Sequence, residues 1–342
     1  MRHPLVLTAA IAATSLLLHP SVSPDEPERP VAGGHLAADA PKLAAPVTPE
    51  PVPAVPPAAI PAAPPQKGVL PFGSGMWIWM PDQVEGGDVA ATIGKAQMFG
   101  LTHLYVKTGS SWEGTINREF LTALLPAAHA VGLRVYGWDF PAFVDINVDL
   151  TRAVEAIQYT TPDGHRLDGF SPDIETESEG VLLSAAAASA YANGLRANAG
   201  PGYPLIATVP RPSDYTVAFY PYAEVIGPMD AVAPMVYWLN REPDSDVAGA
   251  LQWLSQFNKP TLPIGQAYDG APEGGREGNP TYAEISRFIW TSSQHSASAV
   301  SFWSWQHASD ENWLAIQDSP PFALATVAPN GLQPVTTSPP IG

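Results

Sequence analysis

Short apolar or aromatic runs recur along the middle of the chain, and stretches with apolar residues at three- and four-residue spacing separate them. Short apolar runs bounded by turn residues predict buried strands, and the three- and four-residue spacing is typical of amphipathic helices. We expect strands at 76–80, 103–107, 134–138, 169–173, 205–209, 231–237, 262–266 and 300–304. The helical patterns cover 89–99, 119–130, 150–158, 181–199, 247–257 and 282–293.

Strands that alternate with helices indicate an α/β protein with a parallel sheet. Eight such units over residues 73–318 match the size of a (β/α)8 TIM barrel. A doubly wound open sheet is the alternative, but no Gly-rich phosphate-binding turn follows the first strand. The fifth unit is the weakest, because Pro221 and Pro228 leave room for only a short helix.

The two flanks of this barrel differ from it in composition. Residues 1–23 begin with a basic head and an apolar run over 5–18, which predicts a signal peptide, with an uncleaved signal anchor as the alternative. Residues 24–72 are rich in Pro and Ala and predict a disordered linker, and 319–342 predict a disordered tail. We therefore expect a secreted or envelope-associated protein that touches a membrane only through such an anchor.

Charge and residue usage exclude several functions. The net charge of −17 disfavours nucleic acid as a partner, because phosphates are repelled. The chain has no Cys, which excludes disulfides and thiolate metal sites. The eight His residues are scattered, and no Walker loop is present, so we expect neither a metal nor a cofactor. For Lys107 an ion pair with a carboxylate at the barrel rim is favoured over a Schiff-base role.

Aromatic residues gather at the predicted carboxyl ends of the strands, where TIM barrels carry their active sites. Aromatic rings stack on the C–H faces of sugars, which predicts a polysaccharide or oligosaccharide partner. The same rings can instead fill the barrel, and we expect ligand contact above all from Trp238 and Trp305. The candidate substrate-binding residues are Trp77, Trp79, Trp138, Asp139, Tyr237, Trp238, Gln266, Tyr268, Trp303 and Trp305.

Two acids form the clearest candidate for catalysis. Segment 168–175 reads Asp-Gly-Phe-Ser-Pro-Asp-Ile-Glu, and strand alternation places Asp173 and Glu175 on one face. Two close carboxylates do not both ionise easily, so one pKa should rise, as a general acid requires. Glu177 and Glu179 follow at once, so a solvated acidic loop is the alternative, and Glu179 can also help to start the next helix.

This segment resembles the fourth-strand signature of family-18 glycoside hydrolases, Asp-x-x-Asp-x-Asp-x-Glu. Asp168, Asp173 and Glu175 match it, and Ser171 replaces the second acid. The stretch Met-Val-Tyr-Trp at 235–238 is similar to the Met-x-Tyr-Asp of the same family. Family-25 lysozymes are a second relative, since they share the Asp-x-Glu and a Trp-Gln-Tyr similar to 305–307; their first-strand Asp has no counterpart here.

The family-18 resemblance implies a glycoside hydrolase acting on an N-acetylated glycan, of the chitin or peptidoglycan type. Glu175 is then the general acid/base, Asp173 orients the N-acetyl group of the substrate, and Tyr237 hydrogen-bonds that group. Ser171 can hydrogen-bond but cannot take the charge of the missing acid. Asp139, at the end of the third strand, is a candidate to compensate, but a surface or salt-bridge role is favoured for it. The alternatives are a catalytically inactive, envelope-tethered barrel that binds carbohydrate, and a structural envelope module that binds protein.

Overall fold

The structure is a computed structural model that describes residues 68–319 and residue 322. The predicted signal peptide lies outside the described residues, as do most of the predicted linker and tail. None of the helices in the described part is both long and apolar enough to cross a membrane.

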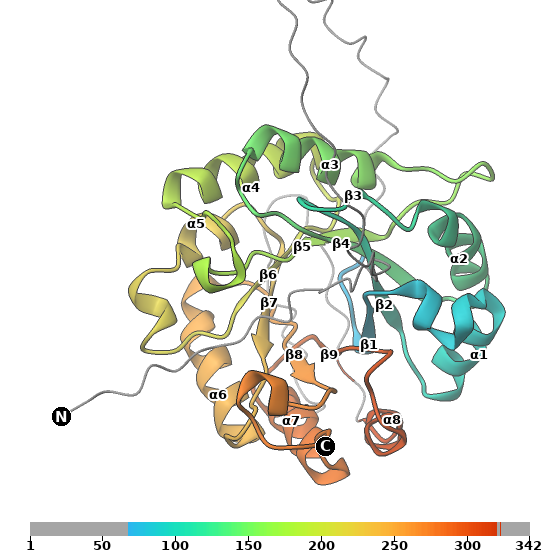
Figure 1. Ribbon diagram of the computed structural model, residues 1–342, viewed down its shortest axis with the longest axis vertical. Helices are drawn as coiled ribbons and strands as arrows, with labels where there is room; N and C mark the ends of the chain where they lie inside the picture. The colour runs from blue at the N-terminus through green and yellow to red at the C-terminus, as the bar shows by residue number, and fades with distance from the viewer. Residues whose placement is uncertain (1–67, 320–321, 323–342) are drawn as a thin grey trace, which may run out of the picture. The chain divides into compact units, whose positions relative to one another are not determined.

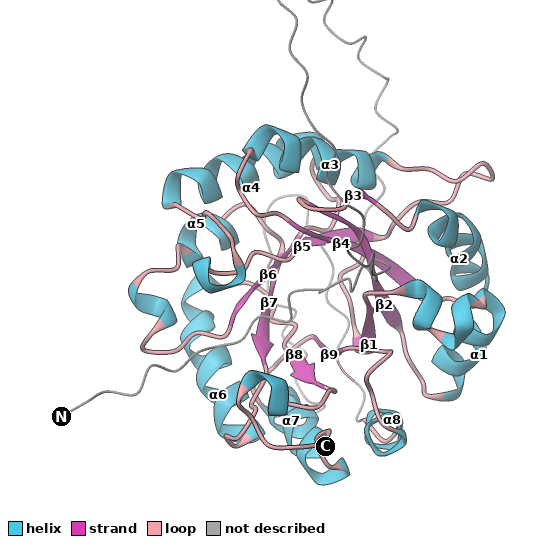
Figure 2. Ribbon diagram, in the orientation of Figure 1, coloured by secondary structure: helices cyan, strands magenta, loops and turns pink. Residues whose placement is uncertain are grey.

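Eight parallel strands follow one another around a barrel, which confirms the predicted (β/α)8 class (Figures 1 and 2). Isolated bridges from Phe170 to Leu205 and from Asp173 to Thr208 join the two ends of the strand order. A short strand that the sequence did not predict, β3, pairs antiparallel with the end of β2. The strands are β1 (Gly73–Ile78), β2 (His103–Ser110), β3 (Gly114–Thr115), β4 (Arg134–Phe140), β5 (Gly169–Pro172), β6 (Ile206–Pro210), β7 (Ala231–Val236), β8 (Ile264–Gln266) and β9 (Ala299–Trp303).

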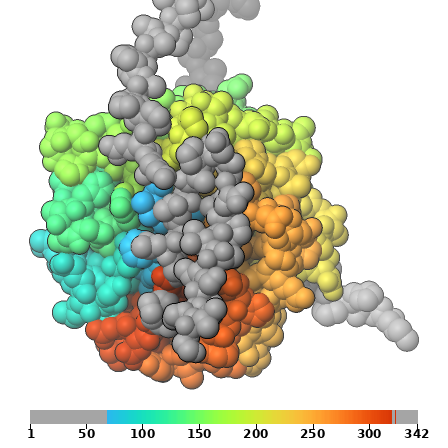
Figure 3. All heavy atoms as spheres, turned by 180° about the vertical axis from the view of Figure 1, so that it is seen from behind, coloured from blue at the N-terminus to red at the C-terminus, as the bar shows by residue number. Residues whose placement is uncertain are grey.

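The helices form the outer layer around the strands (Figure 2). In the reverse view, atoms from the first half of the described chain, in cyan and green, and from the second half, in yellow and orange, lie on opposite sides of the molecule (Figure 3). The helix of the fifth unit is short, as its prolines predict. The helices are α1 (Val89–Met98), α2 (Arg118–Ala130), α3 (Ile146–Gln158), α4 (Ala185–Ala199), α5 (Tyr222–Ile226), α6 (Pro243–Leu254), α7 (Tyr282–Gln294) and α8 (Asp310–Gln317).

Capping residues in the sequence determine where several helices begin. Asp88 accepts a hydrogen bond from the Ala91 amide at the start of α1, and Ser184 caps α4 in the same way. Thr281 and Ser309 form reciprocal capping boxes at α7 and α8. Each cap satisfies amide groups that the helix itself leaves unpaired, so the capping residue marks where each of these helices begins.

Side chains alternate between two environments along each strand. The inward residues, among them Trp77, Tyr105, Tyr136 and Met235, pack together inside the barrel. The outward residues, such as Phe302, pack against the helices. This period of two decides which residues near a strand end face the barrel mouth and which face a helix.

The predicted boundaries of the barrel need correction at both ends. Leu70 is fully buried among the inward residues, and the Tyr136 hydroxyl donates a 2.6 Å hydrogen bond to the Val69 carbonyl. The prediction of disorder is therefore wrong for 68–72, where an apolar side chain packs into the barrel interior. Phe322, in the predicted tail, packs against the outer apolar cluster.

Candidate active site

The chain beyond β5 carries Asp173 and Glu175 at the mouth of the barrel. Phe170 and Ile174 face the outer apolar cluster. Because side chains alternate along a strand, Ser171, Asp173 and Glu175 face inward. The Asp173 amide donates to the Asp139 carbonyl at 2.8 Å, and the Ile174 amide donates to the Thr208 carbonyl at 3.2 Å. Both neighbouring strands thus hold this segment, and the predicted placement of the two acids on one face agrees with the structure.

Asp173 is a buried carboxylate without a cationic partner. Its side chain is 7% exposed, and its Oδ1 atom is buried without a hydrogen-bond partner among the described residues. Burial raises the pKa of Asp173, as do the negative charges of Asp139 and Glu179, while the charge of Lys107 acts to lower it. An unpaired buried carboxylate is costly for folding, which is typical of a group kept for binding or chemistry.

Glu175 is half-buried, and its environment is acidic. Burial raises its pKa well above the usual range, and the charges of Asp173, Glu179 and Glu273 raise it further. The nearby cations are occupied elsewhere. Lys107 pairs with Glu113 at 2.5 Å, and Arg211 lies 3.6 Å from Asp246. Glu175 forms no ion pair within the described part of the chain, and a raised pKa keeps its proton available for donation.

Tyr237 and Tyr268 stand beside these acids. Their rings meet edge to face at 5.6 Å, and the Tyr268 hydroxyl donates to Glu273 at 2.8 Å. Burial raises the pKa of Tyr237 well above its usual range, and the charges of Tyr268, Asp173 and Glu175 add to this. Tyr237 therefore keeps its proton and can donate a hydrogen bond to a ligand at the mouth.

The inward tryptophans fall into two groups. Trp77 and Trp138 are buried, and their indole N–H groups donate to the Ser301 hydroxyl at 2.9 Å and the Ile78 carbonyl at 3.1 Å. These two rings fill the barrel. Trp79 and Trp303 are only partly buried, and their rings lie 6.2 Å apart with an interplanar angle of 25°. Of these inward tryptophans, Trp79 and Trp303 keep part of their rings exposed.

The predicted ligand contacts of Trp238 and Trp305 are wrong. Trp238 is buried against Phe288 of α7, at 5.5 Å between ring centroids. Trp305 is buried edge to face against Trp313 of α8 at 4.7 Å. Trp238 follows the inward Tyr237 directly, so strand alternation turns it toward the helices, a signal that the sequence already contained.

Asp139 and Gln266 also have structural partners. Asp139 is fully buried, and its carboxylate accepts from Arg152 Nε at 2.6 Å. Because it follows the inward Trp138, it faces α3, and the salt bridge excludes it as a substitute for the missing acid. Gln266 accepts from the Leu239 amide at 2.8 Å and so braces the loop after β7.

The other two positions of the sequence motif also have structural partners. Asp168 lies before β5, at the opposite end of the strand from Glu175, and binds Arg134 Nη1 at 2.7 Å and the Val135 amide at 2.8 Å. The Ser171 hydroxyl pairs with that of Thr208 at 2.7 Å. Neither side chain contacts the acids at the mouth through a hydrogen bond.

No sequence motif singles out Glu273, which lies in the loop after β8. No local pattern links it to Glu175, because residues of these two loops approach each other only when the barrel closes. After burial and the charge of Asp173, the negative charges of Glu179 and Glu273 both raise the pKa of Glu175, so Glu179 acts on the site although the sequence allows for it a solvated or helix-starting role. For the described residues, no group of three or more potential ligands is arranged to hold a metal ion.

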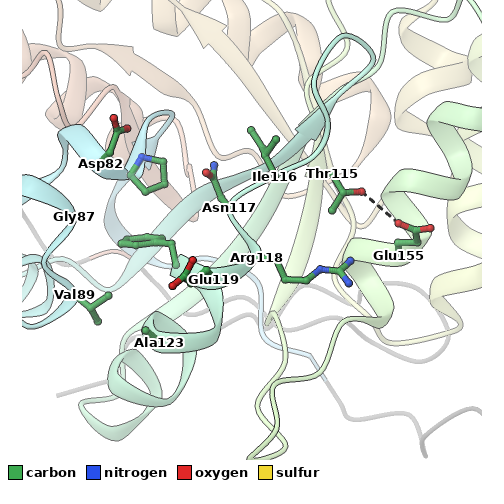
Figure 4. A pocket seen from close by; sticks show the side chains of 12 residues that line it. Asp82, Gly87, Val89, Thr115, Ile116, Asn117, Arg118, Glu119, Ala123 and Glu155 are labelled. Atoms are coloured by element: carbon green, nitrogen blue, oxygen red, sulfur yellow. Dashed lines mark hydrogen bonds between the residues drawn. The ribbon is translucent and has the colours of Figure 1, made fainter.

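A separate cavity of about 940 Å³ lies to one side of these residues. It is lined by the connection after β1, the hairpin after β2 and the start of α2, and Figure 4 shows the Thr115 hydroxyl donating to Glu155 at its edge. Neither Asp173 nor Glu175 lines it. We place the candidate site at the strand ends, because Asp173, with its buried and unpartnered Oδ1 atom, and the half-buried Glu175 lie there.

Comparisons with known proteins give similarity in fold. No protein-family model matches the chain, and no curated protein matches it. The spore cortex-lytic enzyme SleL of Bacillus cereus superposes with a TM-score of 0.54 at 13% identity, over 73% of this chain and 75% of that one. The endo-1,4-beta-mannanase of Rhizomucor miehei superposes with a TM-score of 0.52 at 8% identity, over 68% of this chain and 86% of that one. SleL of Bacillus megaterium superposes with a TM-score of 0.50 at 11% identity, over 75% of this chain and 76% of that one. The chain therefore shares the barrel fold of these proteins.

Proposed function

We propose that the protein is an exported glycoside hydrolase that acts on an N-acetylated glycan. The observation that carries the proposal is the pair Asp173 and Glu175, which face inward beyond β5, have raised pKa values and form no salt bridge with any residue of the described chain. Glycosidic cleavage needs one protonated carboxyl group beside the leaving oxygen, and Glu175 meets that need.

The proposed reaction uses the acetamido group of the substrate as nucleophile. Glu175 donates its proton to the glycosidic oxygen, while the acetamido carbonyl oxygen attacks the anomeric carbon and the bond to the leaving sugar breaks. Asp173 accepts the acetamido N–H and stabilises the positive charge of the cyclic intermediate, and Tyr237 donates to the same group. Water then attacks the anomeric carbon, Glu175 takes a proton from it, and the acetamido group is released.

The structural neighbours support a glycan as the substrate class. SleL is described as a spore cortex-lytic enzyme and the Rhizomucor miehei protein as a mannanase, and both have this barrel. The partly buried rings of Trp79 and Trp303, just after β1 and at the end of β9, offer stacking surfaces for sugar rings. Export rests on the predicted signal peptide.

A catalytically inactive barrel that binds carbohydrate is the second candidate. It is favoured by one observation: Ser171 hydrogen-bonds to Thr208 and cannot share a proton with Asp173, as the missing acid of the family-18 motif does. Under this alternative, Asp173 and Glu175 only hydrogen-bond to the bound sugar.

The test is the Glu175→Gln variant on N-acetylated chito-oligosaccharides and on peptidoglycan. Release of reducing ends should fall by at least about 10³-fold, while affinity for the oligosaccharide and the melting temperature stay close to wild type. Unchanged turnover in the variant would reject the role of Glu175. Saturable binding by the wild type with no product after long incubation would establish the second candidate.

A further inference from the structure

The hydrogen-bond ladder between β5 and β6 ends beside the candidate acids. These strands are neighbours in the barrel, and toward its mouth their pairing ends at the bridge from Asp173 to Thr208 (Figure 1). At this bridge the Ile174 amide donates to the Thr208 carbonyl at 3.2 Å. In a parallel ladder, the next hydrogen bond to the Ile174 carbonyl comes from the amide two residues further along β6, at position 210. That position is a proline, which has no amide hydrogen to donate.

A tyrosine hydroxyl takes the place of this missing donor. Tyr220, in the loop between β6 and α5, donates to the Ile174 carbonyl at 2.7 Å. Its side chain is 5% exposed and packs in the same outer apolar cluster as Ile174. Burial raises the pKa of Tyr220 well above its usual range, so the hydroxyl keeps the proton that it donates. The Ile174 carbonyl therefore obtains its hydrogen bond from a side chain instead of from the neighbouring strand.

Glu175 follows this carbonyl directly. Because the peptide group between Ile174 and Glu175 is planar, a hydrogen bond to its carbonyl also orients the Glu175 amide and Cα. Among the described residues, the Glu175 amide donates to no other backbone group. The Thr176 carbonyl accepts from the Glu179 amide at 3.0 Å, in the 3-10 turn that follows. The backbone of Glu175 is thus held by Tyr220 on the barrel side and by this turn on the loop side.

Tyr222 makes a similar contact to the other strand. Its hydroxyl donates to the Pro210 carbonyl at 3.0 Å, and its ring lies 4.6 Å from that of Tyr220. Both rings are buried, and each hydroxyl satisfies one carbonyl where the ladder ends. Tyr222 holds the end of β6, which carries none of the candidate acids, whereas Tyr220 holds the segment that carries Glu175.

We propose that Tyr220 is a positioning residue for Glu175, because its hydroxyl replaces the ladder donor that Pro210 lacks and orients the peptide before the acid. The inference rests on the proposed function and adds to it a residue that acts through the backbone. A general acid must lie within hydrogen-bond reach of the oxygen that it protonates. A displacement of about 1 Å can cost about 10²-fold in rate, so a single backbone hydrogen bond at this place matters for catalysis.

The experiment compares Tyr220→Phe with Tyr222→Phe, since each variant removes one buried hydroxyl and leaves one carbonyl without its donor. The substrates are an N-acetylated chito-oligosaccharide and a nitrophenyl chito-oligosaccharide, whose leaving group needs little protonation. Tyr220→Phe should reduce kcat/KM about 30-fold for the first and less than about threefold for the second. Tyr222→Phe should change neither value by more than about twofold, although both variants should lower the melting temperature to a similar extent.

A further substitution restores the missing donor. Pro210→Ala introduces an amide at the position from which the ladder supplies the Ile174 carbonyl. In the Tyr220→Phe background it should recover at least about fivefold of the lost kcat/KM for the oligosaccharide. Hydrogen exchange of the Ile174 amide should be about tenfold faster in Tyr220→Phe than in the wild type, unchanged in Tyr222→Phe, and slower again in the double variant.

Several results overturn the inference. Equal losses on both substrates indicate a structural role only, as does a Tyr220→Phe variant that matches Tyr222→Phe in activity and in exchange of the Ile174 amide. A double variant with Pro210→Ala that recovers neither activity nor protection contradicts the replacement of a ladder donor.

The Glu175→Gln variant separates this inference from the proposed function. If Glu175→Gln still hydrolyses the glycan, the catalytic proposal fails, while exchange of the Ile174 amide still tests whether Tyr220 fixes the segment. If Glu175→Gln loses hydrolysis and Tyr220→Phe keeps it in full, the positioning role of Tyr220 alone is rejected.

Discussion

The Nζ atom of Lys107 lies 2.5 Å from Oε2 of Glu113, so the buried lysine nearest to the candidate acids is neutralised by a residue outside their group. The Ser110 hydroxyl donates to the same Glu113 oxygen at 2.6 Å and holds it in place. The ammonium group also lies 5.5 Å from the Trp138 ring and 5.9 Å from the Trp79 ring. Lys107 thus influences Asp173 through its charge, without forming an ion pair with it.

Removing this charge should move the pH dependence of the reaction. In Lys107→Met the pKa of Asp173 should rise further, because the positive charge that lowers it is gone. The acidic limb of the kcat/KM profile should then shift to higher pH, since Asp173 must be ionised to stabilise the intermediate. Glu113→Gln is the matched opposite, because it leaves Lys107 without its counterion, and it should shift the limb to lower pH. Identical limbs in both variants contradict this role.

Asp173→Asn should stabilise the protein at neutral pH while it removes activity. The pKa of Asp173 is raised in the folded state. The contribution of Asp173 to the free energy of unfolding is therefore fully present only at pH values below its pKa in the unfolded state, about 3.9. That contribution is lost as pH rises through the raised folded-state pKa. Thermal unfolding should therefore show a higher melting temperature for the variant at pH 8 and a smaller difference at pH 4. A variant with a lower melting temperature than the wild type at pH 8 would contradict the prediction that the ionised Asp173 carboxylate destabilises the folded protein.

Trp79→Ala and Trp303→Ala should each weaken oligosaccharide binding about tenfold, because each removes a partly exposed stacking surface at the carboxyl ends of the strands. Trp290→Ala is the control, since Trp290 lies on α7, is 60% exposed and should not change affinity. Trp305→Ala should instead lower the free energy of unfolding by about 3–5 kcal/mol, because it empties a packed site. Titration calorimetry and urea unfolding separate the two effects.

Arg152→Met should lower the free energy of unfolding by about 3–5 kcal/mol, because it leaves the carboxylates of Asp139 and Asp149 buried without their cation. Burial already raises the pKa of Asp139 to about 6. Arg287→Met breaks the exposed pairs with Glu242 and Asp244 and should change stability by less than about 1 kcal/mol. Comparable losses from both arginines would contradict the assignment of Asp139 to a buried structural pair.

Local patterns were sufficient wherever one strand or one helix decides the outcome. The alternation of apolar runs and helical spacing predicted the eight units, and the period of two along segment 168–175 predicted that Asp173 and Glu175 face inward together. The same period places Asp139 and Trp238 on the outer face, because each follows an inward neighbour, so their roles could have been predicted correctly. Trp305 lies beyond β9, where strand alternation no longer applies, and only packing against α8 shows its burial.

The sequence by itself determined the barrel and the inward pair of acids, because both follow from short-range periodicity in the chain. Which charges pair depends on the folded arrangement, as in the ion pairs of Lys107 with Glu113 and of Arg152 with Asp139. Only the tertiary structure decided that Leu70, in a proline-rich stretch, packs inside the barrel. These outcomes depend on loops and chain ends that come together only when the sheet closes. Electrostatic and packing energies depend on distances in space, and those distances cannot be read from the order of residues along the chain.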